Sequence, residues 1–181
     1  ELQQTYCARM TSGEFTGTMC LSEPQAGSDV GAARTAAYPV EGKKFKIKGS
    51  KCWISSGDND LGSNVIHTVL ARVEGDPPGT KGLSLFVVPK INLNPDGSLG
   101  EPNDVTLVSI EDKMGIKASA TAVLSFGDND SCYGHMLGER GDGMRMMFQM
   151  MNTERIMVAG MGLGIASAAY QNALAYARER I

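Results

Sequence analysis

The sequence predicts a mainly β protein, with an antiparallel β-barrel-like domain followed by a long C-terminal α-helical segment. From about residue 17 to residue 137, short runs of β-branched and aromatic residues alternate with clusters of Gly, Pro, Asn and Asp. This pattern is typical of an all-β barrel or sandwich. The 22 glycines among 181 residues also indicate many turns. After Gly141, Met, Ala, Leu, Glu and Arg accumulate without a proline, as they do in helices.

Four segments are the clearest strand candidates. Residues 45–49 alternate apolar and basic side chains, so one face of this strand is expected to be buried and the other exposed. Residues 65–73 and 83–88 are more continuously apolar, as expected of strands that are covered on both faces. Residues 121–126 are a further candidate.

Turn-forming residues and helical spacing define the remaining parts of the chain. Residues 74–81 and 92–103 are dense in turn formers and are expected to be connections or hairpin tips rather than core. In the helical segment, small residues recur every three or four positions and form a stripe over which another helix could pack closely. These residues are Ala159, Gly162, Ala166, Ala169 and Ala173.

The domain organisation expected from these patterns has three parts. Residues 1–16 are a lead-in, residues 17–140 are the β domain, and residues 141–181 begin a second, helical domain that is truncated. The chain does not begin with Met, which suggests that it is a piece of a longer protein. The helical stripe likewise suggests that partner helices are missing.

Composition argues against several classes of function. A net charge of −3 provides no basic field for nucleic-acid phosphates. No apolar stretch is long enough to span a bilayer. The four cysteines lack C-x-x-C spacing, so the sequence predicts no metal site and favours free thiols in a reducing, cytoplasmic location.

Two segments carry the most chemical information. Residues 19–29 (MCLSEPQAGSD) join hydroxyl groups and a glycine-containing turn to an apolar approach. Such a turn can present N–H and hydroxyl groups to a flavin ring edge or a pyrophosphate, although it could equally be a solvated loop. Residues 49–57 (GSKCWISSG) contain Trp53, the only Trp in the chain. On residue type alone this Trp is expected in the core, but it could also form a flat wall for an aromatic ring.

Together, these segments resemble the two signatures of the acyl-CoA dehydrogenase middle domain, C-x-[ST]-E-P-x-A-G-S-D and K-x-W-[IT]-[ST]-x-[AG]. Two further matches follow in the family's order, KMGIKASAT at residues 113–121 and LGE at residues 137–139. The resemblance covers residues 17–181, that is, the middle domain and the first helix of the C-terminal domain. Some departures and the long 92–103 loop are similar to the larger subfamily that includes 3-methylmercaptopropionyl-CoA dehydrogenases. The departures are Gln25, Lys117, Ala120 and a polar 128–135 segment in place of V-P.

The resemblance implies a flavin site and part of a substrate site. It places Trp53 against the isoalloxazine ring of FAD and Ser55 near the flavin N5 atom. Ser28 would also approach the CoA portion of the substrate. The residues expected to contact FAD are Met19, Cys20, Leu21, Ser22, Gly27, Ser28, Trp53, Ile54 and Ser55.

The helical segment carries residues similar to those at the family's acyl pocket. Asn152 and Arg155 are expected to bind substrate. In a minority of the family the catalytic carboxylate occupies the position that Glu154 matches, whereas in most members it lies on a later helix, beyond Ile181. A base for the α-proton needs an apolar pocket that raises its pKa. Glu154 could meet this requirement, but an ordinary surface Glu is the favoured interpretation.

The implied activity of the parent enzyme is α,β-dehydrogenation of an acyl-CoA thioester, with hydride transfer to FAD. Electron-transferring flavoprotein would accept the electrons, and the parent would be a homo-oligomer. The alternatives are an acyl-CoA oxidase and a non-catalytic, DNA-associated relative of the family. The isolated fragment is expected to be inactive, because FAD also needs surfaces outside it.

The two histidines have simpler interpretations. His67 lies in an apolar run and is expected to be a hydrogen-bonded core residue. His135 lies in a polar stretch and is expected to be exposed.

Overall fold

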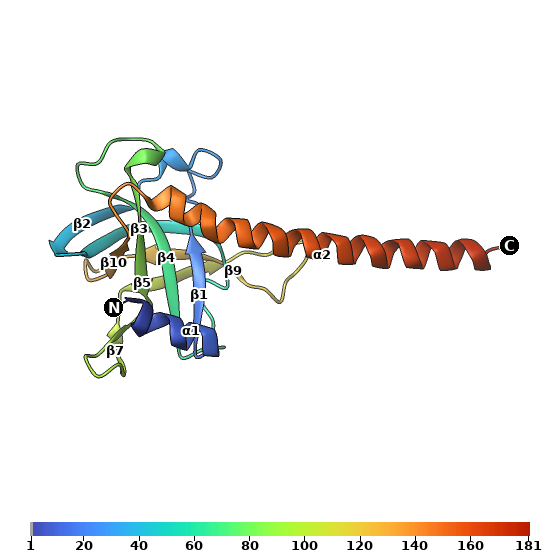
Figure 1. Cartoon of the computed structure of the whole chain (residues 1–181), viewed down its shortest axis with the longest axis horizontal. Coiled ribbons are helices and arrows are strands. Elements are labelled where there is room, and N and C mark those ends of the chain that lie inside the picture. The colour runs from blue at the N-terminus through green and yellow to red at the C-terminus, as the bar shows by residue number, and fades with distance from the viewer. Residues whose placement is uncertain (1) are drawn as a thin grey trace. The chain divides into compact units, whose positions relative to one another are not determined.

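The structure, a computed structural model, describes residues 2–181 and divides into two compact units, Glu1–Met144 and Arg145–Ile181 (Figure 1). The strands are β1 (Phe15–Cys20), β2 (Ala36–Glu41), β3 (Lys44–Ser55), β4 (Asn64–Val73), β5 (Leu83–Pro89), β6 (Ile91–Leu93), β7 (Leu99–Pro102), β8 (Val105–Ile110), β9 (Thr121–Phe126) and β10 (Tyr133–Leu137). The helices are η1 (Gln3–Cys7), α1 (Ala8–Ser12), η2 (Val30–Ala32), η3 (Thr80–Gly82) and α2 (Gly143–Glu179).

The main sheet has eight strands and is mixed rather than purely antiparallel. Its paired strands run in the order β1-β4-β5-β10-β3-β9-β8, and β2 pairs with both β3 and β4. Within residues 2–181, the end strands β1 and β8 do not pair with each other, so the sheet is not a closed barrel. β1 and β2 both run parallel to β4. The expectation of an antiparallel, barrel-like sheet is therefore wrong in two respects: the sheet is not closed, and two of its strand pairs are parallel. The apolar pattern of a strand reports its burial and not which strand lies beside it.

The four strands expected from the sequence are confirmed. β3 buries Phe45 and Ile47 and turns Lys46 and Lys48 outwards, as its alternation of apolar and basic residues predicts. Every residue of β5 is buried, as its continuous apolar sequence predicts for a strand that is covered on both faces. β4 and β9 match the other two expected segments.

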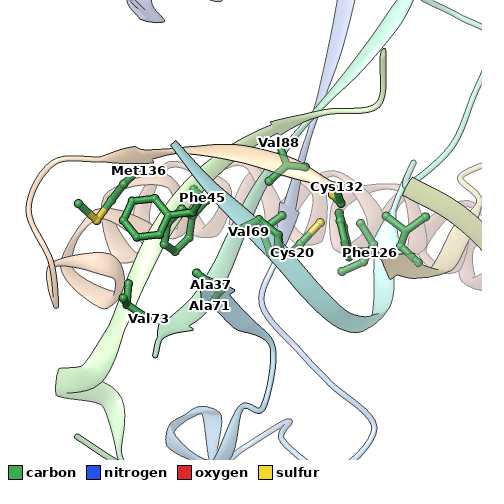
Figure 2. Packing of buried hydrophobic residues seen from close by; sticks show 14 of the residues in the cluster. Cys20, Ala37, Phe45, Val69, Ala71, Val73, Val88, Phe126, Cys132 and Met136 are labelled. Carbon is green, nitrogen blue, oxygen red and sulfur yellow. The ribbon is translucent and has the colours of Figure 1, made fainter. Parts of the chain in front are cut away.

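The hydrophobic core collects side chains from β1 to β5, β9 and β10 (Figure 2). Phe45 and Phe86 pack edge to face at its centre, with ring centroids 5.2 Å apart. Burying one such side chain contributes about 1.5–3 kcal/mol to the free energy of unfolding. The two informative segments, which lie on β1 and β3, each place a residue in this core, Cys20 and Ile54 respectively. The site is therefore built on strands that the core holds in place.

The turn-rich segments are connections and a hairpin, as expected. Residues 92–103 contain the β6–β7 hairpin, which forms a separate two-stranded sheet. Asn103 is the exception, because its side chain is buried. Its amide group donates to the carbonyl oxygens of Pro89 and Tyr133, 2.8 and 2.7 Å away, and it accepts from the Tyr133 N–H at 2.8 Å. This polar residue therefore links β5 to β10.

The second unit consists of α2 beyond Met144, which confirms the expected long helix after Gly141. Its large apolar side chains are more than half exposed at many positions, including Ile156, Leu163 and Tyr170. A helix with apolar side chains on several faces is typical of one that packs against further helices. No helix within residues 2–181 has the length and apolar character that crossing a membrane requires.

Candidate functional site

The first informative segment leaves β1 and makes a tight turn. The Glu23 N–H donates to the Ala26 carbonyl at 3.1 Å, and the Ala26 N–H donates to the Glu23 carbonyl at 2.9 Å. Pro24 lies inside this turn, where its fixed φ suits the bend. The turn presents Gly27, which is partly exposed, and Ser28, which is exposed.

The second informative segment turns Trp53 outwards. The pairing of β3 with β9 shifts register between Lys51 and Ile54, which marks a bulge. Trp53 lies in this bulge with a left-handed φ of +59°, and it is 57% exposed. The expectation from residue type that this Trp fills the core is therefore wrong. A non-glycine residue in this conformation costs about 1–3 kcal/mol and persists only when its surroundings impose it.

These two segments meet in space. A Cβ atom built on Gly27 would lie 3.6 Å from Cζ3 of Trp53, an ordinary contact distance. The Cys52 N–H also donates to the Ser22 carbonyl at 3.0 Å. The backbone of residues 21–28 therefore borders the exposed indole ring.

The third matching segment, residues 113–121, ends beside the same bulge. The Ser56 N–H donates to the Ala120 carbonyl at 2.8 Å, and Ser55 pairs with Thr121 in the β3–β9 ladder. The loop itself is exposed, and Met114 at its tip lies fully in solvent. Segments more than sixty positions apart along the chain thus converge around Trp53.

The residues expected to contact FAD fall into two groups. Met19, Leu21, Ser22 and Gly27 are partly exposed, and Ser28, Trp53 and Ser55 are exposed. Cys20 and Ile54 are 0% and 2% exposed and belong to the core. Their side chains face away from solvent, so only their backbone atoms could contact a cofactor.

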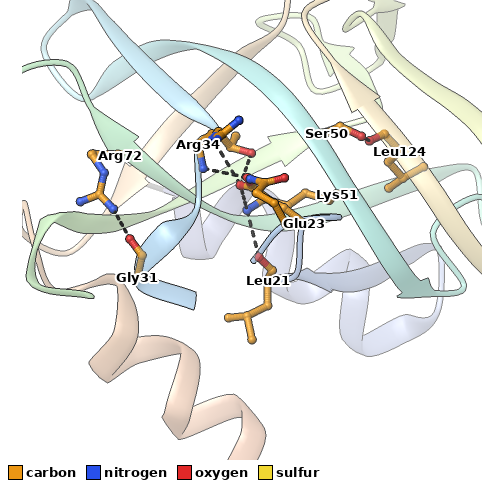
Figure 3. A network of polar contacts seen from close by, with 10 residues as sticks. Leu21, Glu23, Gly31, Arg34, Ser50, Lys51, Arg72 and Leu124 are labelled. Atoms are coloured by element: carbon orange, nitrogen blue, oxygen red, sulfur yellow. Dashed lines mark hydrogen bonds and ion pairs between the residues drawn. The ribbon is translucent and has the colours of Figure 1, made fainter. Parts of the chain in front are cut away.

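A buried ion pair joins the two informative segments (Figure 3). Lys51 Nζ lies 2.9 Å from Glu23 Oε1, and the two side chains are 0% and 3% exposed. Lys51 Nζ also donates to the Leu21 carbonyl at 3.0 Å. The Glu23 carboxylate accepts further hydrogen bonds from the Gln25 side chain, the Arg34 and Thr35 N–H groups and the Thr35 hydroxyl, at 2.6 to 3.0 Å.

The pKa values of this pair follow from its surroundings. Burial alone would raise the pKa of Glu23, but the Lys51 ammonium and the hydrogen bonds from Thr35 and Arg34 outweigh it and lower the pKa to about 2. Burial lowers the pKa of Lys51, and the Glu23 carboxylate opposes that shift. The Glu23 carboxylate is therefore ionised at neutral pH, and Lys51 Nζ is its ion-pair partner.

Sequence reasoning missed this pair, although a signal was present. Glu23 and Lys51 are the charged residues closest to the centres of the two informative segments, and their charges are opposite. A charged residue beside Pro24 or Trp53 reads most simply as an exposed one. Charges of opposite sign inside two otherwise apolar or hydroxyl-rich segments could have indicated that the segments meet.

His67 is buried, as expected, but only one of its ring nitrogens is hydrogen-bonded. Its Nδ1 atom lies 2.7 Å from the Thr18 hydroxyl. Its Nε2 atom has no hydrogen-bond partner among the residues that the structure describes. Burial lowers the pKa of His67 to about 4, so the imidazole is neutral at pH 7. His135 lies in β10 and is half-buried, so the expectation that it is exposed is wrong.

The helical residues singled out from the sequence lie on the second unit. Arg155 donates to the Asn152 side chain at 3.0 Å, and its guanidinium lies 5.4 Å from the centre of the Phe148 ring. Glu154 is exposed, so within this chain no apolar pocket surrounds its carboxylate. No group of three or more His, Cys, Asp or Glu side chains in residues 2–181 is arranged to hold a metal ion.

Comparisons of this chain with known proteins all indicate the same family. The profile of the acyl-CoA dehydrogenase middle domain matches residues 18–129, and that of the C-terminal domain matches residues 141–181. Over 187 residues the chain is 50% identical to a butyryl-CoA dehydrogenase of Syntrophomonas wolfei, covering 100% of the chain and 31% of that protein. It is 44% identical to the 3-methylmercaptopropionyl-CoA dehydrogenase of Ruegeria pomeroyi, covering 97% and 29%.

A solved structure agrees with these relatives. The butyryl-CoA dehydrogenase of Megasphaera elsdenii superposes with a TM-score of 0.78 at 27% identity, covering 99% of this chain and 43% of that one. The chain spans about a third of the length of the two curated relatives. The middle-domain profile covers most of the β unit, and the C-terminal profile of the same family covers the helix. The chain therefore belongs to the acyl-CoA dehydrogenase family.

Proposed function

We propose that the protein to which this chain belongs is a FAD-dependent acyl-CoA dehydrogenase that removes two hydrogens from the α and β carbons of an acyl-CoA thioester. The observation that carries the proposal is the meeting of residues 21–28 with the outward-turned Trp53, with a Gly27 Cβ position 3.6 Å from the ring. Members of the family are FAD-dependent flavoproteins. When bound, FAD supplies the two-electron oxidant.

The residues present fit a planar cofactor. A broad indole face is exposed at Trp53, a residue without a side chain borders it at Gly27, and hydroxyl groups lie on both segments at Ser22, Ser28 and Ser55. Flat apolar surfaces bordered by a few hydrogen-bonding groups are suited to an isoalloxazine ring. We assign Trp53 to the ring face and Ser55 to its polar edge.

The same proposal covers the division of the chain and the substrate contacts. Residues 17–140 form the flavin-contacting middle domain, residues 1–16 lead into it, and residues 141–181 begin the C-terminal helical domain. The exposed apolar side chains of α2 support the last assignment, since they require partner helices. We assign Ser28, Asn152 and Arg155 to acyl-CoA binding.

We do not assign the catalytic base to a residue of this chain. Glu154 is exposed here, whereas a base for an α-proton needs desolvation. In the proposal the base therefore comes from a later helix, and Glu154 is the alternative. Electron-transferring flavoprotein is the proposed electron acceptor, and the homo-oligomer implied by the family resemblance stays a prediction.

In the full-length protein, Trp53→Ala is expected to weaken FAD binding by about 5- to 150-fold, because stacking on an aromatic face is worth about 1–3 kcal/mol. Ser55→Ala should cost about fivefold, the equivalent of one neutral hydrogen bond. Equilibrium dialysis with FAD and the rate of flavin reduction by acyl-CoAs measure both effects. Unchanged flavin content and reduction rate in both variants would remove the proposed roles.

Two observations on the full-length protein would favour the alternative functions. Peroxide formation in air would indicate an oxidase, and salt-sensitive DNA binding without flavin would indicate the non-catalytic alternative.

The 181-residue chain alone is expected to bind FAD weakly or not at all and to show no turnover. Its segments line only one side of a flavin, and such a half-site offers too few contacts to offset the cost of immobilising a large cofactor. Titration of the purified chain with FAD, followed by an assay with short and long acyl-CoAs, tests this. Tight stoichiometric binding with turnover would contradict it and would make Glu154 the leading candidate for the base.

A further inference from the structure

The Glu23 carboxylate joins three separate parts of the chain. It belongs to the turn at residues 21–28, accepts hydrogen bonds from the Arg34 and Thr35 backbone just before β2, and pairs with Lys51 of β3. The approach of Thr35 to β3 is close, because a Cβ atom on Gly49 would lie 2.8 Å from the Thr35 Cα atom. The carboxylate therefore sits where these three segments converge.

Lys51 makes two of the polar contacts between residues 21–28 and β3. Its ammonium group bonds to the Glu23 carboxylate at 2.9 Å and to the Leu21 carbonyl at 3.0 Å. Among residues 2–181, the other hydrogen bond between these two segments joins backbone groups: the Cys52 N–H donates to the Ser22 carbonyl at 3.0 Å. Without Lys51, one backbone hydrogen bond would hold the turn to the strand beside Trp53.

The location of Lys51 connects this pair to the strained bulge. Lys51 is the last regularly paired residue of β3 before the register shift, and Trp53 follows two positions later with φ of +59°. Strained conformations persist where surrounding contacts impose them. The buried, hydrogen-bonded ammonium group fixes the strand immediately before the strained residue.

We propose that Glu23 and Lys51 are a positioning pair: together they hold residues 21–28 against β3, so that Gly27 and Trp53 keep a fixed spacing before any flavin binds. The link to the flavin rests on the proposed function, whereas the spacing itself is a property of the chain. Neither side chain contacts solvent, so the pair acts through the backbone of the two segments that border the indole ring. A preorganised surface loses less conformational freedom when a ligand binds.

The test uses the single Trp of the chain as a local probe, without FAD. Lys51→Met should loosen the turn and uncover Trp53, so acrylamide quenching of its fluorescence should rise, by less than twofold because 57% of the residue is already exposed. In the double variant Glu23→Gln/Lys51→Met, which should keep most of the global stability, hydrogen exchange should speed up in peptides covering residues 21–35 and 51–56 but not in β4 or β5. Lys46→Met is the matched control, because Lys46 pairs with Asp130 at the surface, 2.7 Å away. It should leave both measurements unchanged.

The double variant Glu23→Gln/Lys51→Met keeps the test decisive if Lys51→Met fails to fold. It leaves no unpaired buried charge, so it should fold, yet its Trp53 quenching and its exchange in residues 21–35 should still be raised. Wild-type quenching and exchange in the folded double variant would overturn the proposal, as would faster exchange spread evenly over its whole sheet. In the full-length protein, the double variant should also bind FAD at least about tenfold more weakly. If wild-type full-length protein binds no FAD, the proposed function fails while the fluorescence and exchange results still decide the positioning role.

Discussion

Lys51→Met is expected to lower the free energy of unfolding of the β unit by about 3–5 kcal/mol, the cost of leaving a buried charge without its partner. The substitution removes the ammonium group from a fully buried location and leaves the Glu23 carboxylate, 3% exposed, without its counter-charge. Much of the marginal stability of a domain this size would be lost. Urea unfolding monitored by circular dichroism at pH 7 gives the change directly.

Two further variants distinguish the effect of breaking the buried ion pair from the effect of losing any lysine. Lys46→Met removes an exposed ion pair with Asp130 and should leave the unfolding midpoint nearly unchanged. Glu23→Gln/Lys51→Met should recover most of the lost stability, because a neutral pair carries no unpaired buried charge. A Lys51→Met protein as stable as the wild type would contradict the assignment of a charged, mutually satisfied pair.

The sequence predicted the strands whose own residues carry a clear pattern. The alternation at Phe45 to Lys48 and the apolar runs of β4 and β5 depend on local burial alone, and they were predicted correctly. β10 was missed because Gly134 and His135 interrupt its apolar character. In the structure Gly134 is buried against Val88 and Ile47, where a Cβ atom would have no room. Its strand character therefore depends on its neighbours, which no local pattern reports.

The candidate site was predicted in its segments but not in its geometry. The motifs singled out residues 19–29 and 49–57, and the structure places these two segments side by side. The outward orientation of Trp53 depends on one left-handed residue in a bulge, and that bulge depends on pairing with β9. The Glu23–Lys51 pair likewise depends on contacts between residues 28 positions apart. Both features are tertiary, so residue type alone favoured a buried Trp and exposed charges.

Acidification from pH 6.5 to pH 4 is expected to remove about 3 kcal/mol from the free energy of unfolding through His67 alone. Burial lowers the pKa of His67 from 6.5 to about 4; the nearby Asp58 carboxylate weakly raises this pKa and the Lys90 ammonium weakly lowers it. Below pH 6.5 the unfolded chain binds a proton at this imidazole while the folded chain does not, so stability falls as the pH falls. Below pH 4 both states are protonated and the loss is complete. Glu23 loses its contribution only as the pH falls from 4.5 towards 2, so the two windows barely overlap.

Urea unfolding at a series of pH values between 7 and 4 measures this slope, and the chain supplies its own control because it has two histidines. His67→Asn should abolish most of the dependence between pH 6.5 and pH 4, since an amide can still pair with the Thr18 hydroxyl but does not titrate. His135→Gln should keep the part of the slope that comes from His67, because it leaves His67 and its contact with the Thr18 hydroxyl in place. The comparison uses slopes rather than absolute stabilities, so a constant loss from either substitution does not disturb it. An unchanged slope in His67→Asn would contradict the lowered pKa of His67, because it would mean that folding does not change proton binding at this imidazole.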